Sequence, residues 1–279
     1  MTDLYERLSA TAKVIAEKTG VERHDVALVL GSGLNDYPAT LDDAITVGYE
    51  ELPGFPLPTV VGHTGTVYSV QMGGNRVLMM AGRGHAYEGH PMDTITFPVR
   101  SAILAGCHTV VLTNASGGCG DGLEPGDLVA LTDHVNVAGV SPLTGPNDER
   151  LGPRFPDMTD AYDPALRQLA QQAAGRAGVS LKEGVYFWFR GPMFETPAEV
   201  EMAKRLGADL VGMSTVPEAT AARHMGAQVL GISLCTNLAA GVADQPITSE
   251  EVMETAAVAA DRFQALMNDL LSTIPPAAD

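Results

Sequence analysis

The amino-acid sequence predicts an α/β protein, a single domain in which a central mixed, largely parallel twisted sheet is covered by helices on both faces. Short apolar runs typical of buried strands alternate with amphipathic helical patterns along the whole 279-residue chain. No internal repeat, low-complexity linker or change of composition divides it, so we expect one domain over residues 1–279. Because 45% of the residues are hydrophobic, the chain can bury one large core.

The first half of the chain begins with a predicted amphipathic helix over residues 3–19. Leu4, Leu8, Ala12 and Ile15 recur at helical spacing, and Gly20 follows as a stop signal. The remaining predicted elements of this half are a strand over 26–30, a hairpin of strands 66–70 and 76–80 around residues 73–75, a helix over 94–105 that ends before Gly106, and a strand over 109–113.

The second half contains a long predicted loop at residues 140–163, which are rich in Pro, Gly and Asp. A loop of that length is uncommon in a compact domain and is often functional. Capping boxes at 196–199 and 248–251 predict the starts of two helices, which end at Gly207 and at about residue 271. The other predicted elements are helices over 164–177 and near 217–225, and strands over 185–189, 210–213 and 229–235.

The charge balance limits the possible partners. Acidic residues outnumber basic ones by 34 to 17, and the formal net charge of −17 argues against nucleic acid or an anionic membrane as a partner. No run of about 18 apolar residues is present, and residues 1–7 lack the pattern of a signal peptide, so we expect a cytoplasmic protein. Cys107, Cys119 and Cys235 have no CxxC spacing and are expected to be reduced thiols.

Residues 82–90 are the strongest candidate for anion binding. So acidic a protein must hold a phosphate with local donors, and here Arg83 and His85 alternate, so both face the same way on an extended backbone. Glu88 can orient His85 from behind, and Tyr87 can shape a pocket. Two His, an Arg, a Tyr and a Glu are seldom this close in a purely structural loop, so a functional role is favoured.

Three other segments are weaker candidates for the same anion. Residues 31–33, Gly-Ser-Gly, follow a predicted strand, where a tight turn is the more ordinary interpretation; they match neither a dinucleotide fingerprint, since Asp36 occupies the third glycine position, nor a P-loop. The small residues at 113–118 can form a nest of backbone N–H groups or a flexible strand-exit loop. His63 alone is more typical of a surface residue, and it becomes a candidate only together with these segments.

Three polar side chains of different chemistry, Glu195, Ser214 and Asn237, follow or precede predicted elements. Such positions can converge at one rim of an α/β sheet, where small ligands bind. The structural alternatives are a helix cap, a turn and a left-handed turn residue, respectively. Either Phe194 or Tyr186 can offer an aromatic face to a flat ring.

The motifs that are missing also narrow the function. No cluster of His, Cys and Asp has metal-ligand spacing, so no metal is expected. The absence of Gly-x-Ser-x-Gly disfavours a serine hydrolase. Spacing alone therefore predicts a site for phosphate and a small polar organic ligand.

Eight short motifs occur over nearly the whole chain in an order and spacing that are together highly specific. They are LGSGL at 30–34, GFPLPTVVGHTG at 54–65, GRGHAYEG at 82–89, TNASGG at 113–118, RFPDMTDAYD at 154–163, GPMFET at 191–196, GMSTVPE at 212–218 and TNLAAG at 236–241. In these motifs the chain resembles the trimeric class of purine nucleoside phosphorylases, a family that also includes methylthioadenosine phosphorylase.

The resemblance implies a role for each candidate residue. His85, Glu195 and Asn237 would form the catalytic set, with Glu195 accepting the purine N1–H and Asn237 meeting N7 and O6. Phe155 would reach the ribose pocket of a neighbouring subunit in a homotrimer. Phosphate would be bound by Ser32, His63, Arg83, His85, the Ala115 N–H and Ser214, while the nucleoside would contact Tyr87, Met213 and Phe194.

The reaction implied by the resemblance is reversible phosphorolysis of a nucleoside to a free base and a pentose 1-phosphate. Phosphate would be a co-substrate, and neither a cofactor nor a metal would be needed. The phosphate would stabilise positive charge on the ribose, and Asn237 would stabilise negative charge on the departing purine. Glu195 with Asn237 suggests inosine and guanosine, since the methylthioadenosine branch has Asp in place of Asn237.

Two positions depart from the family pattern. Gly84 stands where many relatives carry an aromatic residue, and Ser249 stands where the family often has a His that binds the ribose 5′-hydroxyl. The alternatives are a methylthioadenosine phosphorylase, disfavoured by Asn237, a nucleoside hydrolase, disfavoured by the phosphate-binding set, and a non-catalytic nucleoside- or phosphate-binding protein.

Overall fold

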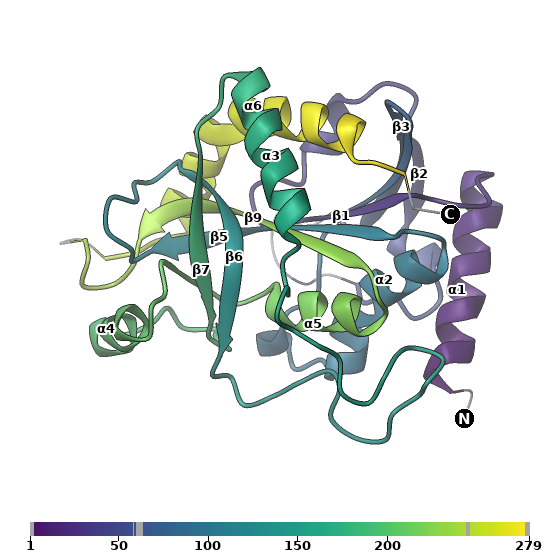
Figure 1. The fold of residues 1–279 in the computed structure, drawn as a ribbon, viewed down its shortest axis with the longest axis horizontal. Coiled ribbons are helices and arrows are strands. Elements are labelled where there is room, and N and C mark those ends of the chain that lie inside the picture. The colour runs from purple at the N-terminus through teal and green to yellow at the C-terminus, as the bar shows by residue number, and fades with distance from the viewer. Residues whose placement is uncertain (1–2, 58, 60–63, 244–245, 277–279) are drawn as a thin grey trace.

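A mixed nine-stranded sheet covered by helices on both faces forms the centre of the computed structural model, which describes residues 3–57, 59, 64–243 and 246–276 (Figure 1). The predicted fold class is therefore confirmed. In the order β2-β3-β4-β1-β5-β8-β7-β6-β9, the strands are Ile45–Gly48, Thr66–Met72, Asn75–Ala81, Val26–Leu30, Thr109–Gly118, Leu210–Gly212, Leu181–Trp188, Leu128–Asn136 and Gln228–Leu238.

One half of the sheet closes on itself. β5 pairs in parallel with β1, and it also pairs with β9 in parallel and with β8 at its end in antiparallel fashion. Because β9 pairs with β6, β6 with β7, and β7 with β8, these five strands form a ring. The other half, β2-β3-β4-β1, extends from this ring as an open sheet.

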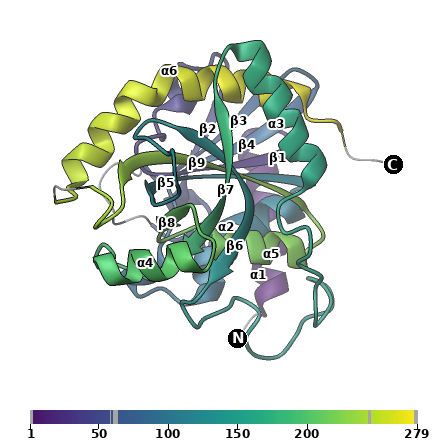
Figure 2. The same ribbon diagram turned by 60° about the vertical axis from the view of Figure 1, so that its left-hand side comes forward.

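The helices lie in two groups on opposite faces of the sheet (Figures 1 and 2). α3 and α6 cover one face, while α1, α2 and α5 cover the other; α4 packs Val200 and Ala203 against Phe187 of β7 and Val211 of β8. The helices are α1 Leu4–Thr19, α2 Met92–Leu104, α3 Pro164–Ala177, α4 Pro197–Arg205, α5 Val216–His224 and α6 Ser249–Thr273.

β1 shows why the central strands read as continuous apolar runs. All five of its residues are buried, but successive side chains enter different cores. Ala27 and Val29 join the core under α1 and α2, whereas Val26, Leu28 and Leu30 join the core under α3 and α6. Burial on both faces removes the polar alternation of a half-exposed strand.

Three departures from the predicted elements concern strands. β2 and β6 are not predicted; β6 has only four buried apolar residues before a polar stretch that pairs with β7. Residues 113–118, predicted as a loop or nest, continue β5, because their backbone pairs with β9 from Thr113 opposite Ile232 to Gly118 opposite Leu238. The small side chains thus belong to a strand whose partner supplies its hydrogen bonds.

Candidate active site

A cavity of about 750 Å³ lies where four parallel strands end. β4, β1, β5 and β9 run in the same direction, so their carboxyl ends meet at one edge of the sheet. Gly31 permits this convergence, since a Cβ there would lie 2.6 Å from the Asn114 Cα. Ten of the thirteen predicted site residues line the cavity: Ser32, Arg83, His85, Ala115 and Ser214, with Tyr87, Phe194, Glu195, Met213 and Asn237.

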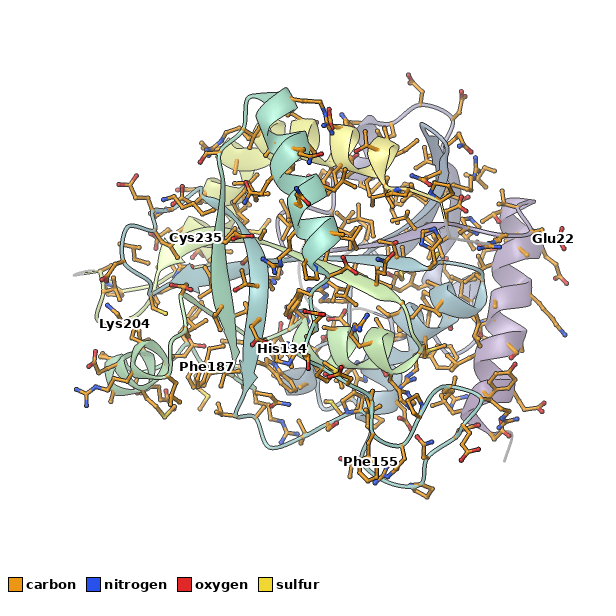
Figure 3. The ribbon with its side chains drawn as sticks, viewed as in Figure 1. Glu22, His134, Phe155, Phe187, Lys204 and Cys235 are labelled. Atoms are coloured by element: carbon orange, nitrogen blue, oxygen red, sulfur yellow. The ribbon has the colours of Figure 1, made fainter. Side chains whose placement is uncertain are left out.

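The other three predicted residues are His63, Phe155 and Tyr186. His63 lies outside the described residues. Phe155 is 87% exposed, at the outer edge of the loop that joins β6 to α3 (Figure 3). Stacking of a ligand on Tyr186 is wrong, because this ring is fully buried in the core and does not line the cavity; its hydroxyl accepts the Ser214 N–H at 3.3 Å.

Arg83, which follows β4, lines the cavity and is held rigidly. Its side chain is 2% exposed. Nη1 donates to the Thr113 carbonyl at 2.8 Å and to the Ser214 hydroxyl at 3.1 Å, while Nε lies 3.1 Å from a carboxylate oxygen of Glu218. A guanidinium restrained in this way is preorganised for an anion.

His85 is oriented from behind by Glu88, as predicted. One carboxylate oxygen of Glu88 accepts the His85 backbone N–H at 2.7 Å and lies 3.2 Å from Nδ1 of the ring, which stacks on Tyr87 at 4.7 Å. Burial and the neighbouring Arg83 lower the pKa of His85 to about 4, against the effect of Glu88. The imidazole is therefore neutral near neutral pH.

Ser214 is presented by a strained turn between β8 and α5. Thr215 has φ +70° and ψ −50°, and the Val216 N–H donates to the Ser214 carbonyl at 2.7 Å, which makes a γ-turn. Such a conformation costs on the order of 1–3 kcal/mol for a residue with a β-branched side chain and persists only where its surroundings fix it. Here Asn114 donates to the Thr215 hydroxyl at 2.9 Å.

Sequence reasoning missed Glu218, which belongs to the same assembly. It is 2% exposed, and besides facing Arg83 it accepts the Thr215 N–H at 3.0 Å. Burial raises the pKa of Glu218, and the Arg83 guanidinium opposes that rise. The Thr-x-x-Glu pattern at 215–218 could have revealed a helix cap, but nothing in the sequence pairs Glu218 with Arg83.

The same cavity is lined by Glu195, which directly precedes the N-cap of α4. Its side chain is 7% exposed, and Oε1 has no hydrogen-bond partner among the described residues. Burial raises the pKa of Glu195, and the nearby Glu199 carboxylate adds to the effect. An unpartnered buried acceptor is costly, so Glu195 is suited to a ligand that donates a hydrogen bond.

Asn237, near the end of β9, also lines the cavity, and neighbouring residues orient its carboxamide. Oδ1 accepts the Thr236 hydroxyl at 3.0 Å, and Nδ2 donates to the Leu238 carbonyl at 3.0 Å. An amide nitrogen has two hydrogens, so the second can serve a ligand in the cavity. Phe194, 43% exposed, provides an apolar wall.

The two positions that depart from the family pattern are both near the cavity. Ser249, the first residue of α6, lines it together with Val252 and Met253 of the same helix. A Cβ on Gly84 would make ordinary contacts with His90 at 3.4 Å and Pro56 at 3.5 Å. A side chain larger than glycine at position 84 would therefore share space with these two residues.

In the parts of the chain that the structure describes, no group of three or more His, Cys, Asp and Glu side chains has an arrangement suited to a metal ion. None of the described helices combines the length and the apolar composition that a membrane span requires.

The fold and the cavity together define an α/β protein that can bind an anion and a flat polar ligand side by side, and comparison with known proteins names its family. The family model described as the phosphorylase superfamily matches residues 25–272. A purine nucleoside phosphorylase of Mycobacterium tuberculosis is 49% identical over 271 residues, which cover 97% of each chain. Purine nucleoside phosphorylase 1 of Geobacillus stearothermophilus is 49% identical over 230 residues, 82% of this chain and 84% of the relative.

A solved structure supports the same family. Schistosoma mansoni purine nucleoside phosphorylase in complex with inosine superposes with a TM-score of 0.91 and 37% sequence identity, covering 98% of each chain. The chain belongs to the purine nucleoside phosphorylase family of the phosphorylase superfamily. The resemblance drawn from the eight motifs is thereby confirmed.

Proposed function

We propose that this protein catalyses the reversible phosphorolysis of 6-oxopurine ribonucleosides and 2′-deoxyribonucleosides, releasing the free base and a pentose 1-phosphate. The observation that carries the proposal is the shared cavity: Arg83, His85 and Ser214, the proposed anion end, line the same space as Glu195 and Asn237, the proposed base end. Related structures in complex with inosine, hypoxanthine and ribose-1-phosphate support it.

The anion end stabilises the reaction by holding phosphate against the sugar. Cleavage of the glycosidic bond builds positive charge on the ribose, and an adjacent phosphate anion stabilises that charge. Ser32, the Ala115 N–H and Ser214 add donors to those of Arg83, and His63 is proposed to join them. Tyr87 and Met213 would flank the ribose.

The base end acts on the departing purine. The ionised Glu195 accepts N1–H of a 6-oxopurine, which satisfies its buried oxygen, and Asn237 donates to the purine as negative charge develops. This pair favours a 6-oxo over a 6-amino group, because a 6-aminopurine has no N1–H to donate. Since a related structure holds adenosine, turnover and not binding is the measure of this preference.

The assay that tests the proposal incubates the protein with inosine, with and without phosphate, and measures hypoxanthine. We expect release that requires phosphate and is faster than base release from adenosine or methylthioadenosine. Release without phosphate would indicate a hydrolase, and binding without release would indicate a non-catalytic protein. A higher rate with methylthioadenosine would favour the other branch of the family.

The proposal also includes the oligomeric state and the cellular location. We propose a homotrimer in which Phe155 enters the site of an adjacent subunit; its 87% exposure in this chain leaves it available for such a contact. The excess of acidic residues argues against nucleic acid or an anionic membrane as a partner, and we propose a cytoplasmic location. Phosphate is proposed as co-substrate, with no cofactor and no metal.

A further inference from the structure

The two oxygens of one buried carboxylate connect the two parts of the anion end. Glu218 Oε1 lies 3.1 Å from Arg83 Nε, and Glu218 Oε2 accepts the Thr215 N–H at 3.0 Å. Arg83 comes from the segment after β4, and Thr215 from the turn between β8 and α5. These segments are more than 130 positions apart in the sequence, so Glu218 fixes their relative placement.

The turn that Glu218 holds does not have a relaxed backbone. Thr215 has a positive φ of 70°, which L-residues with a branched side chain rarely adopt. Its hydroxyl is fixed by Asn114, and the Ser214 N–H is fixed by Tyr186. The Ser214 hydroxyl, one of the predicted phosphate contacts, accepts from Arg83 at 3.1 Å.

We propose that Glu218 is a positioning residue for phosphate: it sets the Arg83 guanidinium and the Ser214 hydroxyl in one geometry before the anion arrives. The inference rests on the proposed function, because it deepens the role of the same cavity. Glu218 does not line the cavity, so it acts on phosphate through Arg83 and Ser214.

Glu199 supplies a matched control within the chain. It occupies the same position of α4 that Glu218 occupies in α5, three residues after an N-cap threonine. Its Oε2 accepts the Thr196 N–H at 2.7 Å, and no arginine is paired with it among the described ion pairs. Glutamine keeps one acceptor oxygen, which suffices for Glu199 but can serve only one of the two partners of Glu218.

The experiment compares Glu218→Gln, Glu218→Asp and Glu199→Gln with the wild type. We measure KM for phosphate and for inosine, and the dissociation constant of phosphate alone by calorimetry. For Glu218→Gln we expect KM and the dissociation constant of phosphate to rise about 10-fold or more, with KM for inosine within about 3-fold. Glu218→Asp keeps the charge but is one methylene shorter, so we expect an intermediate rise; Glu199→Gln should leave both phosphate values unchanged.

The outcomes decide the proposal separately from the function. If the wild type requires phosphate but both Michaelis constants of Glu218→Gln stay at wild-type values, or rise together, Glu218 does not position phosphate. If Glu218→Gln does not fold, Glu218→Asp is judged by the same criterion. Absence of phosphorolysis in the wild type would overturn the proposed function, while the calorimetric binding of phosphate would still test Glu218.

Discussion

The turns before α4 and α5 share one capping sequence, but its glutamate has a different role in each. Each has a threonine N-cap and a glutamate three residues later. At α4 the glutamate, Glu199, caps the helix near the surface, and the ligand-facing group, Glu195, keeps a buried oxygen without a described partner. At α5 the glutamate is fully buried and paired with Arg83.

The contrast separates two strategies within one cavity. The anion end is held in place before a ligand binds, since Arg83 is paired with Glu218 and His85 is oriented by Glu88. The base end is incomplete, because Glu195 Oε1 has no hydrogen-bond partner among the described residues. An end that is already satisfied binds by shape and preorganisation, whereas an unsatisfied end selects the ligand that supplies the missing hydrogen.

Replacement of Arg83, the cation of the anion end, should have the largest effect on activity. We expect Arg83→Met to lower kcat/KM for phosphate by about 10³-fold or more, and to destabilise the fold by about 3–5 kcal/mol because Glu218 is left buried without its partner. The double variant Arg83→Met/Glu218→Met should regain stability but not activity. Chemical denaturation and phosphate kinetics check both; a double variant no more stable than the single one would contradict the account.

The second largest effect on activity is expected at the base end, from loss of the Asn237 donor. We expect Asn237→Ala to lower kcat for inosine roughly 10²–10³-fold, because the leaving purine loses its stabilisation. Phosphate binding measured by calorimetry should be unchanged, which separates the two ends. Near-normal turnover of inosine by this variant would refute the role of Asn237.

The contributions of His85 and Glu195 to folding stability should change with pH in opposite directions. The pKa of His85 lies at about 4 in the fold and 6.5 otherwise, so its stabilising contribution is full above about 6.5 and is lost as the pH falls toward 4. From pH 7 to about 4.5 the wild type should lose about 2–3 kcal/mol of stability relative to His85→Gln. The free energy of unfolding of the wild type and of His85→Gln, measured by chemical denaturation at both pH values, checks this.

For Glu195 the pKa is raised in the fold, so its contribution is present below the usual carboxyl pKa and is lost as the pH rises through the folded value. Relative to Glu195→Gln, the wild type should therefore gain stability on acidification. A loss of stability in the same direction as that of His85 would break the contrast between the ends.

The smallest effect is expected at the surface cap. Glu199→Ala removes the bond to the Thr196 N–H, which should cost about 0.5–1 kcal/mol. Thermal unfolding measures this, with KM for phosphate as the control. A rise in that KM would mean that the α4 turn also contributes to the anion end.

Much of the fold followed from local pattern. α3 begins and ends at the predicted residues 164–177, because Asp163 caps it and Gly178 stops it with a left-handed conformation. The strand extension at 113–118 did not follow, because its pairing with β9 joins segments that are over a hundred residues apart. Ten of the thirteen site residues predicted from the sequence line the cavity.

By itself the sequence determined the alternation of helices and strands, the caps and the types of side chain that chemistry requires, since these depend on neighbours a few positions away. Only the tertiary structure decided that Tyr186 lies in the core, that Glu218 pairs with Arg83 and that one oxygen of Glu195 has no partner among the described residues. Burial and pairing are properties of the assembled interior, where segments far apart in the chain exclude water and fix each other's charges.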